Sequence, residues 1–282
     1  SFHFFYLSHD LGLLYDYPSD TYGRTVLAPI RAHLDASGAT VRPGTEVRTI
    51  ATEGDRFRVL GETFDYLVLA PDVVGARALA ESSPDLHRLA PGAMAKLRTL
   101  VPSQPHAILR LWIDRPSGAD LPGFVITDKQ KLLDSVTFYH RVEEASAAWA
   151  ARTGGSVLEL HCYAVPDGVP ESEIPATLKE ELWGYFPELR GARVLGEHCQ
   201  VNRNFTAFHT GMHAQRPGVH TGHPRLVLAG DWVALDVPAM LMEAAVTSGL
   251  EAANAILRHE RLREAPVYSV PRRGLFARSS SP

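Results

Sequence analysis

Cysteine and long apolar runs are both scarce in this sequence of 282 residues. Two cysteines, Cys162 and Cys199, cannot build the disulfide framework of a small secreted protein, and this favours a reducing compartment. No window reaches the roughly 20 continuous apolar residues that a membrane-spanning helix requires. The N-terminal stretch SFHFFYLSHD lacks the basic region and cleavage site of a signal peptide. We therefore expect a cytoplasmic protein.

An excess of positive charge is also missing. The net charge of −4 and the pI of about 6.3 argue against nucleic acid as the main partner. No G-x-S-x-G occurs, so the sequence lacks the nucleophile motif that would indicate a serine hydrolase. His209 and His213 are four residues apart, but Gly211 and Pro217 interrupt any helix there and no carboxylate or cysteine lies nearby. We predict no metal site.

The G-x-G-x-x-G turn is also absent. This turn brings the backbone close to a pyrophosphate at the start of a dinucleotide-binding βαβ unit. None of the 22 glycines forms it, and the chain begins with Ser1 instead of Met. A dinucleotide bound here therefore requires a phosphate-binding unit from outside this sequence.

The most informative stretch is Pro224–Arg258. Arg225–Ala229 is a short apolar run typical of a buried strand, and Gly230-Asp231-Trp232 follows it directly. After a break at Pro238, residues 239–257 carry apolar side chains at three- and four-residue steps, which predicts a helix. A strand, a small turn with one acid and a helix N-terminus suit a polar or anionic ligand. On spacing alone, a unit with only a structural role is equally consistent.

This stretch resembles a known family. The pattern L-x-L-A-G-D-W, followed by P-A-M-L-M-E-A-A and S-G-L-x-A-A-N, is similar to the C-terminal flavin segment of the FAD-dependent carotenoid desaturase and amine oxidase superfamily. The resemblance implies that the acid after the strand contacts the ribityl–phosphate part of FAD and that the helix start lies near the flavin ring. By position, the cofactor-binding residues that it nominates are Gly230, Asp231, Trp232, Pro238, Ala239, Met240, Met242 and Glu243.

Earlier segments resemble the same superfamily more weakly. A helix predicted at Asp20–Ser37 precedes G-A-x-V, V-R-x-I and D-Y-L-V-L-A, with short strands expected at 40–42, 46–51, 56–60 and 62–70. In the superfamily these pieces complete the FAD domain, and the resemblance places the main chain of Val47 near the adenine. Short β-runs with glycines are common, so Val47 has little support by itself.

The fold class that follows is α/β (α+β), the later part of a two-domain FAD-binding flavoprotein. We expect FAD-domain pieces at 19–73 and 222–260. Residues 1–18 and 74–221 would form a substrate domain with a mixed sheet, because strands and helices alternate irregularly there. The tail at 261–282 is expected to be disordered. The first FAD unit would lie on another polypeptide or a missing segment, or would have been lost.

Within the superfamily the chain resembles carotenoid φ-ring synthases of the isorenieratene synthase type. This implies an FAD-dependent oxidoreductase that dehydrogenates an apolar isoprenoid or carotenoid by hydride transfer to flavin, inactive without the missing unit. Peripheral membrane contact would suit such a substrate. No side chain stands out as a base, so catalytic residues stay unassigned. The aromatic candidates for the substrate cavity are Phe2, Phe4, Phe5, Tyr6, Tyr139, Phe205, Phe208 and Trp232.

Two other functions remain open. An amine oxidase would keep the flavin and change the substrate, but Lys129, Lys131 and Lys179 lack the context of a lysine beside the flavin ring. A non-catalytic subunit that completes the flavin site of a partner is the third reading, and the missing G-x-G-x-x-G turn supports it.

Overall fold

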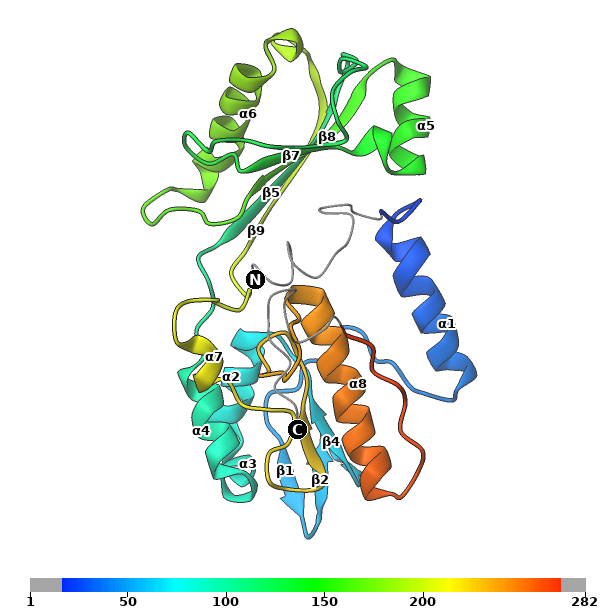
Figure 1. The fold of residues 1–282 in the computed structure, drawn as a ribbon, viewed down its shortest axis with the longest axis vertical. Coiled ribbons are helices and arrows are strands. Elements are labelled where there is room, and N and C mark those ends of the chain that lie inside the picture. The colour runs from blue at the N-terminus through cyan, green and yellow to red at the C-terminus, as the bar shows by residue number, and fades with distance from the viewer. Residues whose placement is uncertain (1–16, 270–282) are drawn as a thin grey trace, which may run out of the picture. The chain divides into compact units, whose positions relative to one another are not determined.

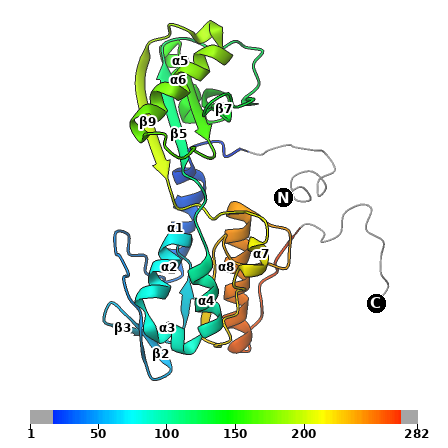
Figure 2. The ribbon, with the colours of Figure 1, turned by 90° about the vertical axis from the view of Figure 1, so that its left-hand side faces the viewer.

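The computed structural model describes residues 17–269, which form two compact units. Within that range, the first unit contains residues 45–103 and 204–269, and the second contains residues 17–44 and 104–203 (Figures 1 and 2). The chain leaves the first unit after Ser103 and returns to it at Asn204. Each unit has its own hydrophobic core.

A parallel pair of strands lies at the centre of the first unit. Strand β4 (Leu67–Leu69) pairs with β10 (Leu226–Leu228), with Leu67 opposite Leu226. Both strands have the sequence LVL, and all three residues of β10 are buried. Continuous apolar runs of this kind are typical of parallel strands that are covered on both faces. The strand predicted at 225–229 is confirmed with slightly shorter bounds.

Antiparallel strands and short helices surround this pair. Strands β1 (Ala51–Glu53), β2 (Arg56–Val59) and β3 (Glu62–Phe64) form a three-stranded sheet. Helix α2 (Val73–Ser82) begins at Asp72, whose carboxylate accepts the Gly75 N–H at 2.7 Å. Helices α3 (Pro84–Leu89) and α4 (Pro91–Thr99) each start with proline, which suits a first turn because its missing N–H would be unpaired there.

The longest helix, α8 (Leu241–His259), packs on β10 in the first unit. Its buried side is built from small residues, among them Ala244, Ser248 and Ala252, so the helix lies close to the sheet. Trp232 and Phe57 are the largest fully buried side chains of this core. Helix α7 (Met212–Gln215) is a single turn before the final strand.

The second unit is built on a five-stranded sheet in the order β6-β7-β8-β5-β9. Its strands are β5 (His106–Ile113), β6 (Phe124–Ile126), β7 (Ser135–Phe138), β8 (Ser156–Cys162) and β9 (Val194–Asn202). All described pairs are antiparallel, so the expectation of a mixed sheet was wrong for this unit. Helix α5 (Glu144–Thr153) lies in the connection between β7 and β8, which run antiparallel, whereas α6 (Ile174–Tyr185) lies in the connection between β8 and β9. β8 and β9 run in the same direction, but β5 separates them and is antiparallel to both, so no parallel pair forms.

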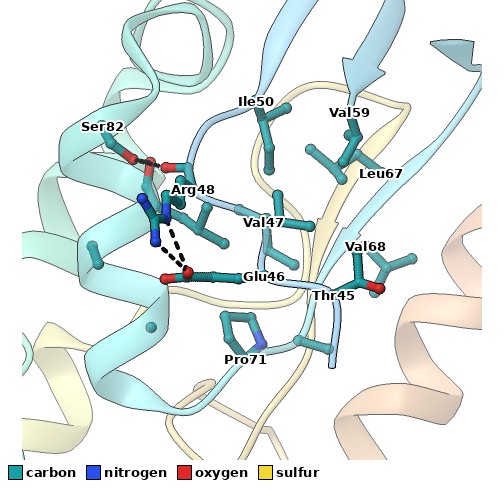
Figure 3. A pocket seen from close by; sticks show the side chains of 15 residues that line it. Thr45, Glu46, Val47, Arg48, Ile50, Val59, Leu67, Val68, Pro71 and Ser82 are labelled. Carbon is teal, nitrogen blue, oxygen red and sulfur yellow. Dashed lines mark hydrogen bonds and ion pairs between the residues drawn. The ribbon is translucent and has the colours of Figure 1, made fainter. Parts of the chain in front are cut away.

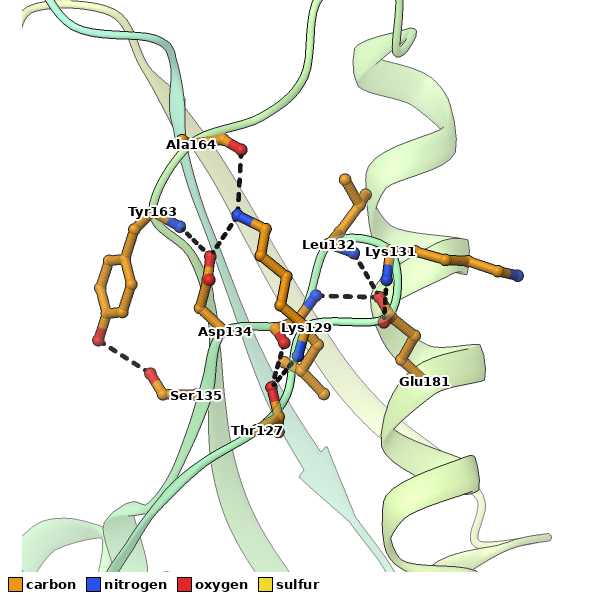
Figure 4. Close-up of polar contacts among 10 residues, drawn as sticks. Thr127, Lys129, Lys131, Leu132, Asp134, Ser135, Tyr163, Ala164 and Glu181 are labelled. Atoms are coloured by element: carbon orange, nitrogen blue, oxygen red, sulfur yellow. Dashed lines mark hydrogen bonds and ion pairs between the residues drawn. The ribbon is translucent and has the colours of Figure 1, made fainter.

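Helix α6 (Ile174–Tyr185) covers one face of this sheet. Its Leu178 and Leu182 pack among the inward side chains of β5, whose residues alternate between buried and half-buried. From the same helix, the buried Glu181 accepts three backbone N–H bonds, from residues 131, 132 and 133, at 2.8, 2.7 and 2.9 Å (Figure 4). One carboxylate thus fixes the turn between β6 and β7.

The remaining elements of the second unit are helical. Helix α5 (Glu144–Thr153) ends at Gly154, whose φ of +72° is the left-handed conformation that suits glycine. The helix expected at Asp20–Ser37 consists of a π-helical turn, η2 (Gly23–Leu27), and α1 (Ala28–Ala36). Three short 3-10 segments complete the unit: η3 (Tyr139–Arg141), η4 (Glu171–Glu173) and η5 (Pro187–Leu189).

Several expected boundaries differ from these elements. Residues 40–42 and 46–50 form no strand, because no neighbouring strand pairs with them in the described structure. Residues 74–103 and 204–221, assigned to the substrate domain from sequence, group with the first unit, and 19–44 group with the second. Ala265 lies in the tail that was expected to be disordered. Its backbone N–H donates to Oδ1 of Asn254 on α8, and its carbonyl accepts Nδ2 of the same side chain, both at 2.8 Å. Residues 1–16 and 270–282 lie outside the described residues, and the functional assignment of the two domains stays a prediction.

Candidate functional site

The turn that follows β10 holds the chain in a conformation that only glycine adopts easily. Gly230 has a φ of +139°, and a Cβ there would lie 2.5 Å from Nε1 of Trp232. Its N–H donates to Oγ of Ser248 on α8 at 2.8 Å, and the same hydroxyl bonds to the Gly230 carbonyl at 3.1 Å. The end of the strand is therefore tied directly to the helix.

The Trp232 side chain packs against this turn from the core of the first unit. The residue is fully buried, and its Nε1 donates to the carbonyl of Pro71, after β4, at 2.8 Å. Its ring consequently packs in the core of the first unit and joins the ends of the two parallel strands. In the described structure this is a packing role, and the expected contribution of the ring to a cavity has no support there.

Asp231 is oriented by groups distant in sequence. Its Oδ1 accepts the Thr206 hydroxyl at 2.8 Å, and its backbone carbonyl accepts Nη1 of Arg216 at 3.1 Å. Arg216 also donates through Nη2 to the carbonyl of Ala207 at 3.2 Å and lies over the Phe208 ring at 4.6 Å. Within residues 17–269, Oδ2 of Asp231 accepts no hydrogen bond and is available to a ligand.

The start of α8 presents backbone donors near this turn. Pro238, Ala239 and Met240 precede the helix, which begins at Leu241, two residues later than expected. Met240 provides no side-chain cap, and Met242 and Glu243 lie in the exposed first turn. The N-terminal end of a helix of 19 residues carries partial positive charge and favours negative ligand groups. The arrangement fits an anionic or polar ligand.

A second feature of the first unit is a cavity of about 560 Å³ beside β4 (Figure 3). Val47 lines it together with Ile50, Val59 and Leu67, and the Glu46–Arg48 pair lies beside Ser82 at its rim. The cavity is mostly apolar, so it suits a flat ring or apolar side chains more than a phosphate.

The outer edge of β4 has no strand beside it in the described part of the chain. Leu67 donates its N–H to Arg225 at 2.9 Å and Leu69 accepts from Ala229 at 2.9 Å, so these residues face β10. Peptide groups alternate along a strand, and those of Val68 therefore point to the other edge. Val68 is 42% exposed. Parallel sheets are normally covered and paired on both sides, so this edge fits a further strand.

The aromatic candidates for a substrate cavity are not brought together in one unit. Phe205 and Phe208 are exposed in the first unit, while Tyr139 lies in the second. Tyr139 lines a cavity of about 270 Å³ with Arg110 and Glu143. Phe2, Phe4, Phe5 and Tyr6 lie outside the described residues. The shared substrate cavity stays a prediction.

Sequence reasoning missed a charged cluster in the second unit. Glu159 on β8 accepts Nη2 and Nε of Arg110 at 2.6 and 2.8 Å, and His161 approaches it at 3.1 Å. Burial raises the pKa of Glu159, but the bond from His161 and the charge of Arg110 outweigh it, so that this pKa lies below its usual range. Burial, reinforced by Glu159, raises the pKa of Tyr139 to about 12. The only sequence signal was the E-x-H spacing, which places both side chains on one face of a strand.

Among the described residues, no group of three or more His, Cys, Asp or Glu side chains could hold a metal ion. In the same part of the chain, no helix is long and apolar enough to cross a membrane.

Comparison with known proteins assigns the family. Residues 18–257 match the family of flavin containing amine oxidoreductases, and this match includes β4, the turn after β10 and nearly all of α8. The chain belongs to this family. The resemblance to the carotenoid desaturase and amine oxidase superfamily is thereby confirmed.

Two curated relatives are carotenoid phi-ring synthases. The protein from Chlorobaculum tepidum is 43% identical over 216 residues, which cover 76% of this chain and 33% of that protein. The protein from Streptomyces griseus is 36% identical over 286 residues, which cover 98% of this chain and 54% of that protein. The chain therefore spans about half the length of the Streptomyces relative, and less of the other.

Solved structures agree on the fold. Reduced UDP-galactopyranose mutase superposes with a TM-score of 0.64 at 12% identity, over 87% of this chain and 53% of that one. Identity this low indicates a shared fold alone. This mixed α/β fold thus resembles about half of that solved chain.

Proposed function

We propose that this chain is the flavin-ring portion of an FAD-dependent oxidoreductase that dehydrogenates an apolar isoprenoid, with a carotenoid as the favoured substrate. The observation that carries the proposal is the alignment of 98% of the chain with the carotenoid phi-ring synthase of Streptomyces griseus. Family membership supports the cofactor, and the name of the relative supports the substrate class.

The residues of the first unit fit the cofactor. Gly230 lets the strand end pack closely on Trp232 and Ser248, Asp231 offers a free carboxylate oxygen, and the first turn of α8 offers N–H groups. Residues 238–243 would lie along the ring, and Val47 would contact the other end through the cavity beside β4. A bound flavin would supply the hydride acceptor.

The protein groups have defined tasks in this proposal. Thr206 and Arg216 hold Asp231 so that its carboxylate is oriented before the ligand arrives. Ser248 keeps the strand end against α8, so the distance between the acid and the helix start stays fixed. The phosphate-binding unit would come from another segment or polypeptide and pair with the outer edge of β4. Peripheral membrane contact stays a hypothesis.

The visible spectrum of the purified 282-residue chain tests the cofactor. An oxidised flavin absorbs near about 370 and 450 nm. A chain that becomes yellow only when the remaining part of a phi-ring synthase relative is co-expressed supports a flavin site in two parts. A chain that stays colourless both alone and with that co-expressed part contradicts the proposal.

Asp231→Ala tests the strand-end site itself. We expect weaker FAD retention in a chain that still folds cooperatively, with a lower urea midpoint because Thr206 loses its acceptor and the buried Arg216 loses the attraction of this carboxylate. Asp236→Ala, on the same loop, is the control. Unchanged FAD retention in Asp231→Ala would show that the acid has no contact with the cofactor.

A further inference from the structure

Arg216 is an unusually buried cation at the strand-end site. Only 7% of the residue is exposed. Its two terminal nitrogens donate to the carbonyls of Asp231 and Ala207 at 3.1 and 3.2 Å. The guanidinium thus joins the turn after β10 to the segment that follows β9, two pieces of chain that otherwise meet through Thr206 and Asp231.

The charge of this guanidinium has no direct counterion within residues 17–269. Both of its protein bonds go to neutral carbonyls, and the Phe208 ring covers it at 4.6 Å. The carboxylate of Asp231 attracts it without forming an ion pair, since Oδ1 is occupied by Thr206. The buried Nε–H has no acceptor at all among these residues.

A second cation lies close by. Lys96 on α4 donates through Nζ to the backbone carbonyl of Arg216 at 3.4 Å. Burial lowers the pKa of Arg216 and Asp231 acts in the opposite direction, but a guanidinium remains protonated in proteins. Arg216 is therefore a permanent positive charge in a poorly hydrated place, where charges act more strongly than in water.

A buried charge without a partner and a buried donor without an acceptor are both unfavourable, and such groups concentrate at functional sites. If Arg216 served only to link the two chain segments, a neutral side chain such as an amide could donate to the same two carbonyls without burying a charge. The charge without a direct ion pair, together with the buried Nε–H without an acceptor, points instead to a ligand that carries or gains negative charge beside Asp231. Two-electron reduction adds negative charge to a flavin ring, and nearby charges tune its electronic properties.

We propose that Arg216 positions the strand-end turn for the cofactor and stabilises the reduced, negatively charged flavin through its fixed positive charge. The inference rests on the proposed function for the identity of the ligand. It assigns Arg216 a positioning and electrostatic role; the guanidinium is held away from solvent by the two carbonyls and the Phe208 ring.

The midpoint potential of the bound flavin tests this role, in the 282-residue chain co-expressed with the remaining part of a phi-ring synthase relative. Arg216→Gln removes the charge and keeps an amide donor, so we expect its potential to fall by at least about 30 mV, a tenfold change in a two-electron equilibrium. Arg216→Lys keeps the charge and loses the two-pronged link, so its potential should stay near that of the wild type while its Kd for FAD rises.

Arg258→Gln is the matched control for net charge. It removes an exposed arginine near the other end of α8, about 26 Å along the helix from Leu241, and should leave the potential unchanged. A potential that is unchanged in Arg216→Gln, or that falls equally in the Lys and Gln variants, overturns the inference.

The outcomes separate this inference from the proposed function. A wild-type protein that holds no flavin contradicts the proposed function. A flavin-bound wild type with an unaffected Gln variant contradicts only the role of Arg216. If Arg216→Gln fails to fold, Arg216→Lys provides the test. A flavin midpoint potential equal to that of the wild type, with a higher Kd for FAD, supports the inference. A potential and a Kd that both equal those of the wild type overturn it.

Discussion

The replacement of Gly230 by alanine tests whether the strand-end turn is fixed by close packing. The new Cβ would lie 2.5 Å from Nε1, 2.9 Å from Cε2 and 3.0 Å from Cδ1 of Trp232. That ring cannot move freely, because it is fully buried and donates to the Pro71 carbonyl. Alanine must therefore displace either the turn or the indole.

If the turn keeps its conformation and the indole is displaced, two energetic costs add. A φ of +139° in a residue with a Cβ costs about 1–3 kcal/mol. Loss of the indole hydrogen bond, with the N–H left buried, costs about 1–3 kcal/mol more. We expect Gly230→Ala to lower the free energy of unfolding by about 4 kcal/mol, a large part of the roughly 5–15 kcal/mol that stabilises a typical domain.

Urea unfolding followed by circular dichroism measures this difference. Gly249→Ala is the matched control, since this helical glycine has no atom within 4 Å of an added Cβ and no positive φ. Alanine is favoured over glycine inside a helix by about 1 kcal/mol, so the control should be neutral or stabilising. A Gly230→Ala protein within about 1 kcal/mol of the wild type would refute the packing argument.

Two further predictions concern the second unit. Glu181→Ala leaves three backbone N–H groups without their acceptor and should lower the free energy of unfolding in urea by about 3 kcal/mol. The control Glu180→Ala removes an exposed carboxylate and should change this free energy by no more than about 0.5 kcal/mol. Equal losses in the two variants would contradict the role of Glu181. The pKa of Glu159 is lowered in the folded state, so its contribution is complete above the unfolded-state pKa and disappears as pH falls through the folded value. Wild-type stability should fall more steeply than that of Glu159→Gln from about pH 5 to about pH 3, and parallel curves would exclude this linkage.

The family and the main elements could be predicted from sequence because their signals are local. The apolar run before Gly230 and the periodic small residues of α8 define a strand and a helix without reference to the rest of the chain. Residues 40–42 and 46–50 have similar β-type composition, but a strand forms only where a neighbour offers a ladder of hydrogen bonds. Composition carries no information about that neighbour.

The contacts that shape the site could not be predicted from sequence either, because they join residues that are distant along the chain. Arg216 follows a short helix in a loop rich in glycine and proline, and nothing in its local pattern shows that it reaches Asp231 and Ala207. Likewise, Glu159 and Arg110 are 49 residues apart and meet only through strand register. Motif comparison finds the residue that touches a ligand more easily than the residue that orients it.

The strand-end site is already ordered by protein contacts alone. Ser248 fixes Gly230, while Thr206 and Arg216 fix Asp231, and none of these bonds involves a ligand or the outer edge of β4. Preorganisation reduces the entropy that binding must overcome. We therefore expect the isolated chain to keep the shape of this half-site yet to retain FAD weakly, because the turn that would hold the pyrophosphate is not encoded in it. Tight binding should return when a segment that pairs with β4 supplies that turn.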